Sequence, residues 1–268
     1  MISNTPWLAP ANAWWVEEAR RLHDAERHVR EVTLLSRRRR GVTLADAYRV
    51  QAHGAALRVE QGARIVGHKV GLTSEAMQLQ VGIDEPDSGV LLDTMAVANG
   101  GTVAMEGLRA PRVEAEIAFL IGDEVCGVAT PDADTGQVVA GVCLALEVID
   151  SRFVLEGITL ADSVADNAGC ARFVLGDVRP VEGLDLLSEE VTLAIANRAV
   201  EGGRGEAILG DPIRSLAWLA RRLADLGSQL RAGDVVLAGA VHASIPLPRG
   251  QTVTASSAHL GSVMLDVA

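Results

Sequence analysis

The sequence predicts an α+β protein in which helices come first and a β-rich region follows. Two amphipathic segments precede residue 62, short β-rich runs separated by glycine begin near Arg64, and one strong helix signal comes late in the chain. This order lacks the βαβ alternation of a doubly wound sheet. The chain has 268 residues, 49% of them hydrophobic, which suffices for one large domain, or for a large domain with a small companion. We therefore predict a helical N-terminal portion over residues 1–66 and a β-rich domain over residues 67–268.

Two helices are expected in the N-terminal portion. The first covers residues 13–35, where apolar side chains recur at helical spacing between charged ones. The second covers residues 44 to about 61, because Thr43 can cap its first turn and Gly62 follows its end. Four consecutive arginines at residues 37–40 lie between them. They can form a phosphate patch, but the favoured interpretation is a solvated run that complements a helix end.

The β-rich domain is predicted from short apolar and β-branched runs. These runs cover residues 65–66, 113–121, 138–149, 191–196, 235–238 and 263–267. One helix is expected among the later runs, with Asp211 as its cap, Pro212 in its first turn and Gly227 after its end.

Charge and composition exclude several classes of partner. The chain has 35 acidic and 24 basic side chains and a formal net charge of −11, which repels nucleic acid and anionic lipid at long range. Residues 1–12 lack a signal-peptide pattern, and no stretch of eighteen uncharged apolar residues occurs. We expect a cytoplasmic protein with no nucleic-acid or membrane partner.

The numbers of cysteines and aromatic residues exclude further kinds of structure and binding surface. Cys126, Cys143 and Cys170 are odd in number and far apart, so they predict neither a disulfide framework nor a zinc ribbon, but small buried side chains. Four Trp, one Tyr and three Phe are too few for base-stacking or sugar-stacking surfaces.

Three glutamates are the most informative candidates for a site. In the strand predicted at 113–121, alternation places Glu114 and Glu116 together on the face opposite Val113. Glu147 lies near the end of an apolar run, where an ionised carboxylate is costly to desolvate. A shared Mg²⁺ or Mn²⁺ would compensate all three, and no Cys or His pair favours zinc. The alternative leaves the first two solvated and pairs Glu147 with an arginine such as Arg152.

Lys69 is a second candidate, in the glycine-flanked, apolar stretch 67–74. Burial would lower the pKa of this lysine and make it a usable acid or base, whereas the alternative is a surface lysine on a turn. Residues 85–87 and 162–167 are expected to be acid-bearing loops that orient a substrate or cap turns. The six histidines are scattered, and no Walker A, G-x-S-x-G or H-E-x-x-H motif occurs.

These residues lie in motifs that cover nearly the whole chain in order. On them the chain resembles the 2-keto-4-pentenoate hydratase and 2-oxo-3-hexenedioate decarboxylase family, within the fumarylacetoacetate hydrolase superfamily. The motifs are residues 67–74, 85–87 with Gly89, 112–117, Leu146-Glu147 followed by Asp150-Ser151-Arg152, 164–168 and 260–263. The resemblance implies that residues 67–268 form a mixed β-roll catalytic domain, preceded by the small helical portion, and that the protein is a homo-oligomer.

The resemblance also implies roles for individual residues. Glu114, Glu116 and Glu147 would bind Mg²⁺ or Mn²⁺, Lys69 would be the acid/base, and Asp87 would position water or substrate. The candidates for the substrate pocket are Leu72, Asp166, Asn167 and Gly239. Two departures from relatives concern substrate contacts: Gly169 stands where many have Ser, and Ala238 where many have a hydroxyl or Gly.

The implied substrate is a small anionic 2-oxo or 2-hydroxydienoate acid. A hydratase would add water to a 2-hydroxy-2,4-dienoate and give a 4-hydroxy-2-oxo acid, a step of meta-cleavage aromatic catabolism. The alternative is decarboxylation of 2-oxo-3-hexenedioate (4-oxalocrotonate). Residues 85–93 favour the hydratase, whereas residues 147–152 suit either enzyme. Association with a neighbouring pathway enzyme is a further expectation.

The sequence argues against two other functions. A catalytically silent partner subunit would have no need of the three glutamates and Lys69. Hydrolysis of a carbon–carbon bond normally requires a water-activating arrangement that contains histidine, and the scattered histidines suggest none.

Overall fold

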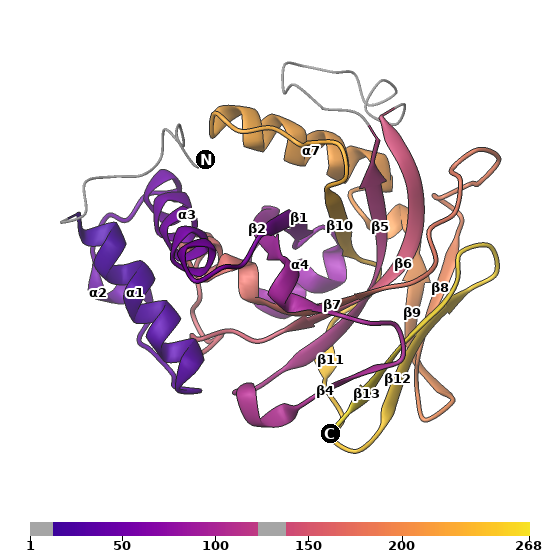
Figure 1. Ribbon diagram of the computed structural model, residues 1–268, viewed down its shortest axis with the longest axis horizontal. Helices are drawn as coiled ribbons and strands as arrows, with labels where there is room; N and C mark the ends of the chain where they lie inside the picture. The colour runs from indigo at the N-terminus through magenta and orange to yellow at the C-terminus, as the bar shows by residue number, and fades with distance from the viewer. Residues whose placement is uncertain (1–12, 123–137) are drawn as a thin grey trace.

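The computed structural model describes residues 13–122 and 138–268, and it consists of two β-sheets flanked by helices (Figure 1). The larger sheet has the strand order β2-β1-β10-β5-β6-β7-β3, and β11 pairs with β5. Its strands are β1 (Ile65–Gly71), β2 (Asp87–Leu92), β3 (Ala96–Val97), β5 (Arg112–Ile121), β6 (Val139–Ile149), β7 (Cys170–Leu175), β10 (Val235–Ala240) and β11 (Ile245–Pro246). Parallel and antiparallel pairs both occur, so this sheet is mixed.

The second sheet has five strands in the order β4-β13-β12-β8-β9. They are β4 (Gly101–Val103), β8 (Glu190–Ile195), β9 (Arg198–Arg204), β12 (Thr252–Ser257) and β13 (Gly261–Val267). Apolar side chains from β5 and β6 form one buried core with those from β8, β12 and β13. Because one face of β5 is filled by this core, its polar residues are turned to the opposite face.

The helices lie mainly on one side of the larger sheet, with α1 and α3 side by side and α7 across one end (Figure 1). They are α1 (Trp14–Arg27), α2 (Leu35–Arg38), α3 (Leu44–Glu60), α4 (Glu75–Val81), α6 (Leu160–Ala165) and α7 (Pro212–Asp225). Four 3₁₀ turns complete the described elements: η1 (Asp93–Met95), η2 (Met105–Gly107), η3 (Asn167–Gly169) and η4 (Gly205–Ala207). None of the helices in the described ranges is long and apolar enough to span a membrane.

The expected helix over residues 13–35 is wrong in its last third. Helix α1 ends at Arg27, and Val29 takes a left-handed conformation with φ of 51°. The amide of Arg30 then bonds back to the carbonyl of Ala25 at 2.8 Å, which closes the helix end. The amide of Val32 bonds to the carbonyl of Arg152 at 2.9 Å. A long-range contact therefore overrides the helical periodicity, and the arginine run begins within the separate short helix α2.

The other element predictions are largely confirmed. Thr43 and Asp46 cap α3 reciprocally, and Asp211 caps α7 by accepting the amide of Ile213 at 2.9 Å. Each of the six predicted β-rich runs overlaps a strand of one of the two sheets. The segments expected to be loops are corrected: Asp87 begins β2, and residues 162–165 belong to α6.

Buried cysteines were also expected. Cys143 and Cys170 are buried and free, while Cys126 and residues 1–12 lie outside the described residues.

Helix α3 holds the beginning of β2 in place. The amide group of Gln51 donates to the carbonyls of Ser88 and Val164, at 2.7 and 2.9 Å, and the Tyr48 hydroxyl lies 3.0 Å from Oγ of Ser88. The helices also share an apolar core with Phe153. The boundary at residues 66 and 67 remains a prediction, but the contacts show that α3 supports the strand that carries Asp87.

Candidate metal centre

Three buried glutamates meet where β5 pairs with β6. Glu114 is directly opposite Glu147 in the antiparallel register, and Glu116 follows two residues along the same face of β5. One carboxylate oxygen of each residue lies within 4.8 Å of the other two. The side chains are buried, so the alternative of a solvated face is wrong. Arg152 pairs with Asp166 and not with Glu147, which also removes the alternative for that carboxylate.

Most oxygens of this glutamate cluster lack hydrogen-bond donors. Glu116 Oε2 accepts the amide of Gly239 at 2.8 Å. Within the described part of the chain, Oε1 of Glu114, Glu116 and Glu147 have no hydrogen-bond partner, and Oε2 of Glu147 has only its ion pair with Lys69. Buried carboxylate oxygens left in this state are costly. An oxygen-preferring divalent cation has the charge and the ligand type to satisfy them, so the residues present fit such an ion.

The carboxylates strongly affect one another's protonation. Burial, together with the charge of Glu147, raises the pKa of Glu114 to about 8 and raises the pKa of Glu116 well above its ordinary value. The positive charge of Lys69 lowers the pKa of both glutamates, but not enough to cancel these increases. In the metal-free chain Glu114 and Glu116 therefore hold their protons more strongly than free glutamates do, and a bound cation would compete with those protons.

Lys69 is the nearest cation to this cluster. Its Nζ lies 3.4 Å from Oε2 of Glu147, and its side chain is 4% exposed, so the surface-lysine alternative is wrong. Burial alone lowers the pKa of Lys69, but the charges of Glu147, Asp87 and Glu114 raise it well above its ordinary value. The expected lowered pKa is therefore wrong for the metal-free chain, because several carboxylates surround one ammonium group. A divalent cation that neutralised these carboxylates would weaken this effect.

Asp87 lies beside Lys69 on the neighbouring strand. In the β1–β2 ladder, Gly71 is opposite Asp87 and Lys69 is opposite Gly89. The hydroxyl of Ser163 donates to Oδ2 of Asp87, while Oδ1 has no partner among the described residues. Burial raises the pKa of Asp87 despite the opposing charge of Lys69. The structure thus presents one free carboxylate oxygen of Asp87 near the Lys69 ammonium.

Gly71 provides the space between these two side chains. A Cβ atom at this position would lie 2.3 Å from Oδ1 of Asp87 and 3.0 Å from Nζ of Lys69. Neither Gly71 nor Ser163 was recognised from the sequence as part of the site. The Thr159–Asp162 capping box, which starts α6, is a local signal that would have indicated the helix carrying Ser163.

The four pocket candidates are placed differently. The Gly239 amide contacts the cluster directly, and Leu72 adopts a left-handed conformation with φ of 57° just after Gly71. Asn167 bonds in both directions to the backbone of Val90, at 2.8 and 3.0 Å, and so secures β2. Asp166 is bound by Arg152. The structure therefore brings Gly239 to the carboxylates, places Leu72 in the apolar core beneath the helices, and shows Asp166 and Asn167 in structural contacts.

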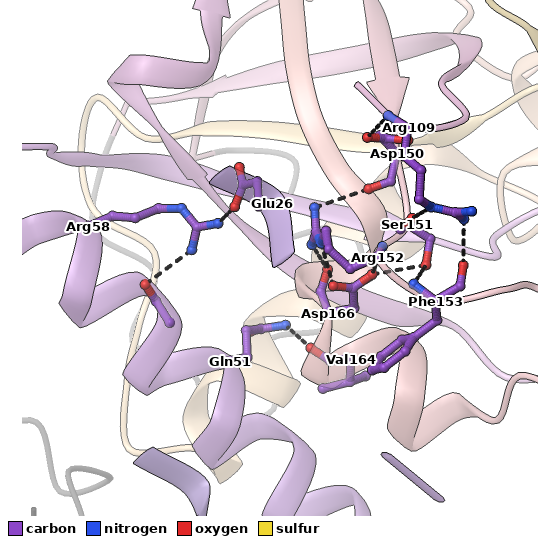
Figure 2. A network of polar contacts seen from close by, with 11 residues as sticks. Glu26, Gln51, Arg58, Arg109, Asp150, Ser151, Arg152, Phe153, Val164 and Asp166 are labelled. Atoms are coloured by element: carbon purple, nitrogen blue, oxygen red, sulfur yellow. Dashed lines mark hydrogen bonds and ion pairs between the residues drawn. The ribbon is translucent and has the colours of Figure 1, made fainter. Parts of the chain in front are cut away.

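A polar network supports the segment that follows Glu147 (Figure 2). The Arg152 guanidinium donates to Oδ1 of Asp166 at 2.5 Å, and the Ser151 hydroxyl donates to Oδ2 at 2.9 Å. Asp150 in turn accepts the amide of Arg109 at 2.9 Å. The network joins the end of β6 to the segment after α6, so it fixes the two elements that carry Glu147 and Ser163.

Comparisons with known proteins identify the family of this chain. The family model described as fumarylacetoacetate (FAA) hydrolase C-terminal matches residues 64–268. A 2-keto-4-pentenoate hydratase from Burkholderia vietnamiensis is 40% identical, over 91% of this chain and 94% of that protein. A 2-hydroxyhexa-2,4-dienoate hydratase from Comamonas testosteroni is 33% identical, over 87% of this chain and 89% of that protein.

A solved structure extends the comparison to the fold. The 4-oxalocrotonate decarboxylase from Pseudomonas putida G7, complexed with magnesium and adipate, superimposes with a TM-score of 0.91 and is 33% identical, covering 95% of this chain and 97% of that chain. The mixed sheet with helices at its N-terminal side is the fold that the resemblance implied. The chain belongs to the fumarylacetoacetate hydrolase family.

Proposed function

We propose that this protein is a hydratase that depends on Mg²⁺ or Mn²⁺ and adds water to a 2-hydroxy-2,4-dienoate. The observation that carries the proposal is the cluster of buried, largely unbonded carboxylates of Glu114, Glu116 and Glu147 next to Lys69 and Asp87. Relatives named as hydratases of such acids, up to 41% identical, support the choice of reaction. The cytoplasmic location, the homo-oligomer and an associated pathway enzyme remain predictions.

The proposed metal site supplies one part of the chemistry. A divalent ion held by the three glutamates would chelate the carboxylate and the 2-oxygen of the substrate and stabilise the negative charge that develops on that oxygen. The glutamates would bind the ion through the oxygens that have no hydrogen-bond partner. The Gly239 amide holds Glu116 in position for this. Burial of the cluster excludes bulk water, which strengthens these interactions.

The remaining steps are proton transfers and water addition. As the dienol becomes the 2-oxo-3-enoate, the Lys69 ammonium donates a proton to C5 and takes back the proton that leaves the 2-hydroxyl group, so the lysine ends this step protonated. Water then adds at C4, and its second proton ends on C3, so the product contains one more water than the substrate. Oδ1 of Asp87, which has no partner in the described residues, can accept a proton from the attacking water, and Ser163 keeps the carboxylate in that orientation.

A decarboxylase is the second candidate, because the 4-oxalocrotonate decarboxylase has the same fold at 33% identity. The same negative charge on the 2-oxygen would develop when CO₂ leaves a 2-oxo-3-enedioate. Purified protein with Mg²⁺ or Mn²⁺ is expected to convert 2-hydroxypenta-2,4-dienoate to a product heavier by one water, detected by mass spectrometry. CO₂ release from 2-oxo-3-hexenedioate without hydration of the dienoate would instead establish the decarboxylase.

Gly71→Ala is expected to lower turnover about ten- to a hundredfold without unfolding the protein. The added methyl group would displace the Asp87 carboxylate and press on Lys69, and both contacts are with movable ends of side chains. Steady-state kinetics and thermal unfolding check this result. Gly54→Ala, on α3 with only the end of Arg58 within 4 Å, is the matched control and should leave turnover unchanged. Equal turnover in both variants would contradict the assigned geometry.

Stabilisation by Mg²⁺ is expected to increase with pH. The pKa of Glu114 is about 8 in the folded, metal-free chain, above its ordinary 4.5, so this group stabilises the fold fully below about pH 4.5 and loses that effect as pH rises through about 8. Mg²⁺ competes with those protons. The rise in melting temperature on adding Mg²⁺ should therefore grow from about pH 6 to about pH 9. A rise that is independent of pH would contradict the proposed ligands.

A further inference from the structure

A buried hydroxyl next to the glutamate cluster has no assigned task. The Thr73 residue is 3% exposed, and its Oγ1 has no hydrogen-bond partner among the described residues. Burying a hydroxyl without a partner costs free energy, so such a group is normally satisfied by protein, water or a ligand. Thr73 is therefore a candidate for a ligand contact.

The Thr73 hydroxyl lies against the residue that holds Glu116. A Cβ atom on Gly239 would be 1.9 Å from Oγ1 of Thr73, so this hydroxyl occupies the space that the glycine leaves open. The amide of the same glycine donates to Oε2 of Glu116 at 2.8 Å. Thr73 also follows Gly71 by two residues, and a Cβ atom on Gly71 would meet both Asp87 and Lys69. The hydroxyl thus lies against the glycine that holds Glu116, on the segment that passes Lys69 and Asp87.

The backbone around Thr73 is fixed, although its hydroxyl is not bonded. The carbonyl of Thr73 accepts the amide of Leu209 at 3.0 Å, and the carbonyl of Leu72 accepts the side-chain amide of Gln78 at 2.9 Å. Leu72 is held in the left-handed region, which is unfavourable for a residue with a side chain. Unfavourable backbone conformations of this kind are maintained where the surrounding structure requires them, often at functional sites.

We infer that the Thr73 hydroxyl is a substrate-binding group that donates a hydrogen bond to the carboxylate of the 2-oxo acid held at the glutamate cluster. The inference rests on the proposed function for the substrate class. The carboxylates of the site carry no donor for an anion when ionised, and the ammonium group of Lys69 is paired with Glu147. A neutral hydroxyl on a fixed backbone supplies that donor without adding charge.

The test compares Thr73→Val, which keeps the shape and removes the hydroxyl, with Thr73→Ser, which keeps the hydroxyl. Oxalate is the probe, because it chelates metal as a 2-oxo acid does, and its binding to Mg²⁺-loaded protein is measured by calorimetry. We expect Thr73→Val to weaken oxalate about ten- to a hundredfold, with Mg²⁺ affinity within about twofold of wild type. Thr73→Ser should bind oxalate within a few-fold of wild type.

Metal-free stability separates this role from a structural one. Because the hydroxyl has no partner in the described chain, Thr73→Val should leave the melting temperature of the metal-free protein unchanged or raise it. The matched control is Thr254→Val on β12 of the other sheet, which should bind oxalate as wild type does.

Each contrary result has a distinct meaning. Unchanged oxalate affinity in Thr73→Val would overturn the inference, and so would a loss of oxalate affinity that merely follows a loss of Mg²⁺ affinity. A lower melting temperature of the metal-free variant would identify a structural hydroxyl instead. The oxalate measurement needs no turnover, so failure of wild-type protein to hydrate the dienoate would count against the proposed reaction and leave the Thr73 result readable.

Discussion

Lys69→Met is expected to reduce hydration of the dienoate by roughly a thousandfold or more while the protein still folds and binds Mg²⁺. Methionine has a similar length and suits a side chain that is 4% exposed, but it can neither donate nor accept the proton. Removing the ammonium also removes a positive charge 3.4 Å from Glu147, so Mg²⁺ affinity should be retained or increased. Single-turnover assays and calorimetry measure the two effects separately.

The composition of the chain makes this residue unusually easy to observe. Lys69 is the only lysine of the sequence. Protein labelled with isotopic lysine should therefore give one side-chain amine signal in NMR spectra, absent from Lys69→Met. In the metal-free protein this signal should remain that of an ammonium group at pH 9, because burial, which lowers the pKa, is outweighed by the charges of Glu147 and Asp87.

A second, partly buried cation controls for loss of charge alone. Arg58 on α3 is paired with Glu26 and not with a glutamate of the cluster. Arg58→Met should destabilise the protein but leave turnover per folded molecule unchanged. Full activity in Lys69→Met would remove the lysine from the mechanism, and equal losses in both variants would attribute the effect to folding.

The shared face of Glu114 and Glu116 was predictable from the sequence because local periodicity determines it. Two-residue alternation places Glu114 and Glu116 on one face of β5 whatever the rest of the fold, and the apolar run around Glu147 indicates a buried carboxylate. Pairing of β5 with β6 then brings the three together. The caps of α3 and α7 were predictable for the same reason, since capping depends on neighbouring residues.

The features that could not be predicted depend on contacts between distant segments. Helix α1 ends early where the chain turns to bond with Arg152, more than a hundred residues away. The direction of the Lys69 pKa shift depends on carboxylates from β2, β5 and β6, which no local pattern reveals. The position of the Thr73 hydroxyl next to Gly239 likewise depends on the placement of β10, which the local sequence does not reveal.

Glu116→Gln is expected to weaken Mg²⁺ binding by a hundredfold or more and to reduce turnover at least in parallel. Replacing a group that only orients a metal ligand lowers metal affinity or activity about ten- to a hundredfold. Replacing a ligand itself should therefore have a larger effect. The amide oxygen of glutamine can still accept the Gly239 amide, which would turn the NH₂ group toward the cluster in place of the free Oε1. Calorimetry with Mg²⁺ and steady-state kinetics at saturating Mg²⁺ measure these losses.

The same substitution should stabilise the metal-free protein at alkaline pH. Burial and the charges of Glu147 and Glu114 raise the pKa of Glu116 well above its ordinary value, so ionising it in the folded state costs free energy that the unfolded chain does not incur. Glutamine removes this cost. Thermal unfolding without metal should therefore give a higher melting temperature for Glu116→Gln than for wild type at about pH 9, whereas added Mg²⁺ should reverse the order.

Glu18→Gln distinguishes this behaviour from the removal of any buried carboxylate. Glu18 is 4% exposed and is bound by Arg38, so its charge is paired and contributes to stability. The glutamine variant should lose stability with and without Mg²⁺ and keep its turnover. If Glu116→Gln behaved in the same way, Glu116 would be a structural ion-pair residue. We expect the opposite result, in which the metal-free protein is stabilised by Glu116→Gln and destabilised by Glu18→Gln. That result would mean that holding the carboxylates of β5 and β6 together costs free energy of folding, and that a bound cation removes this cost.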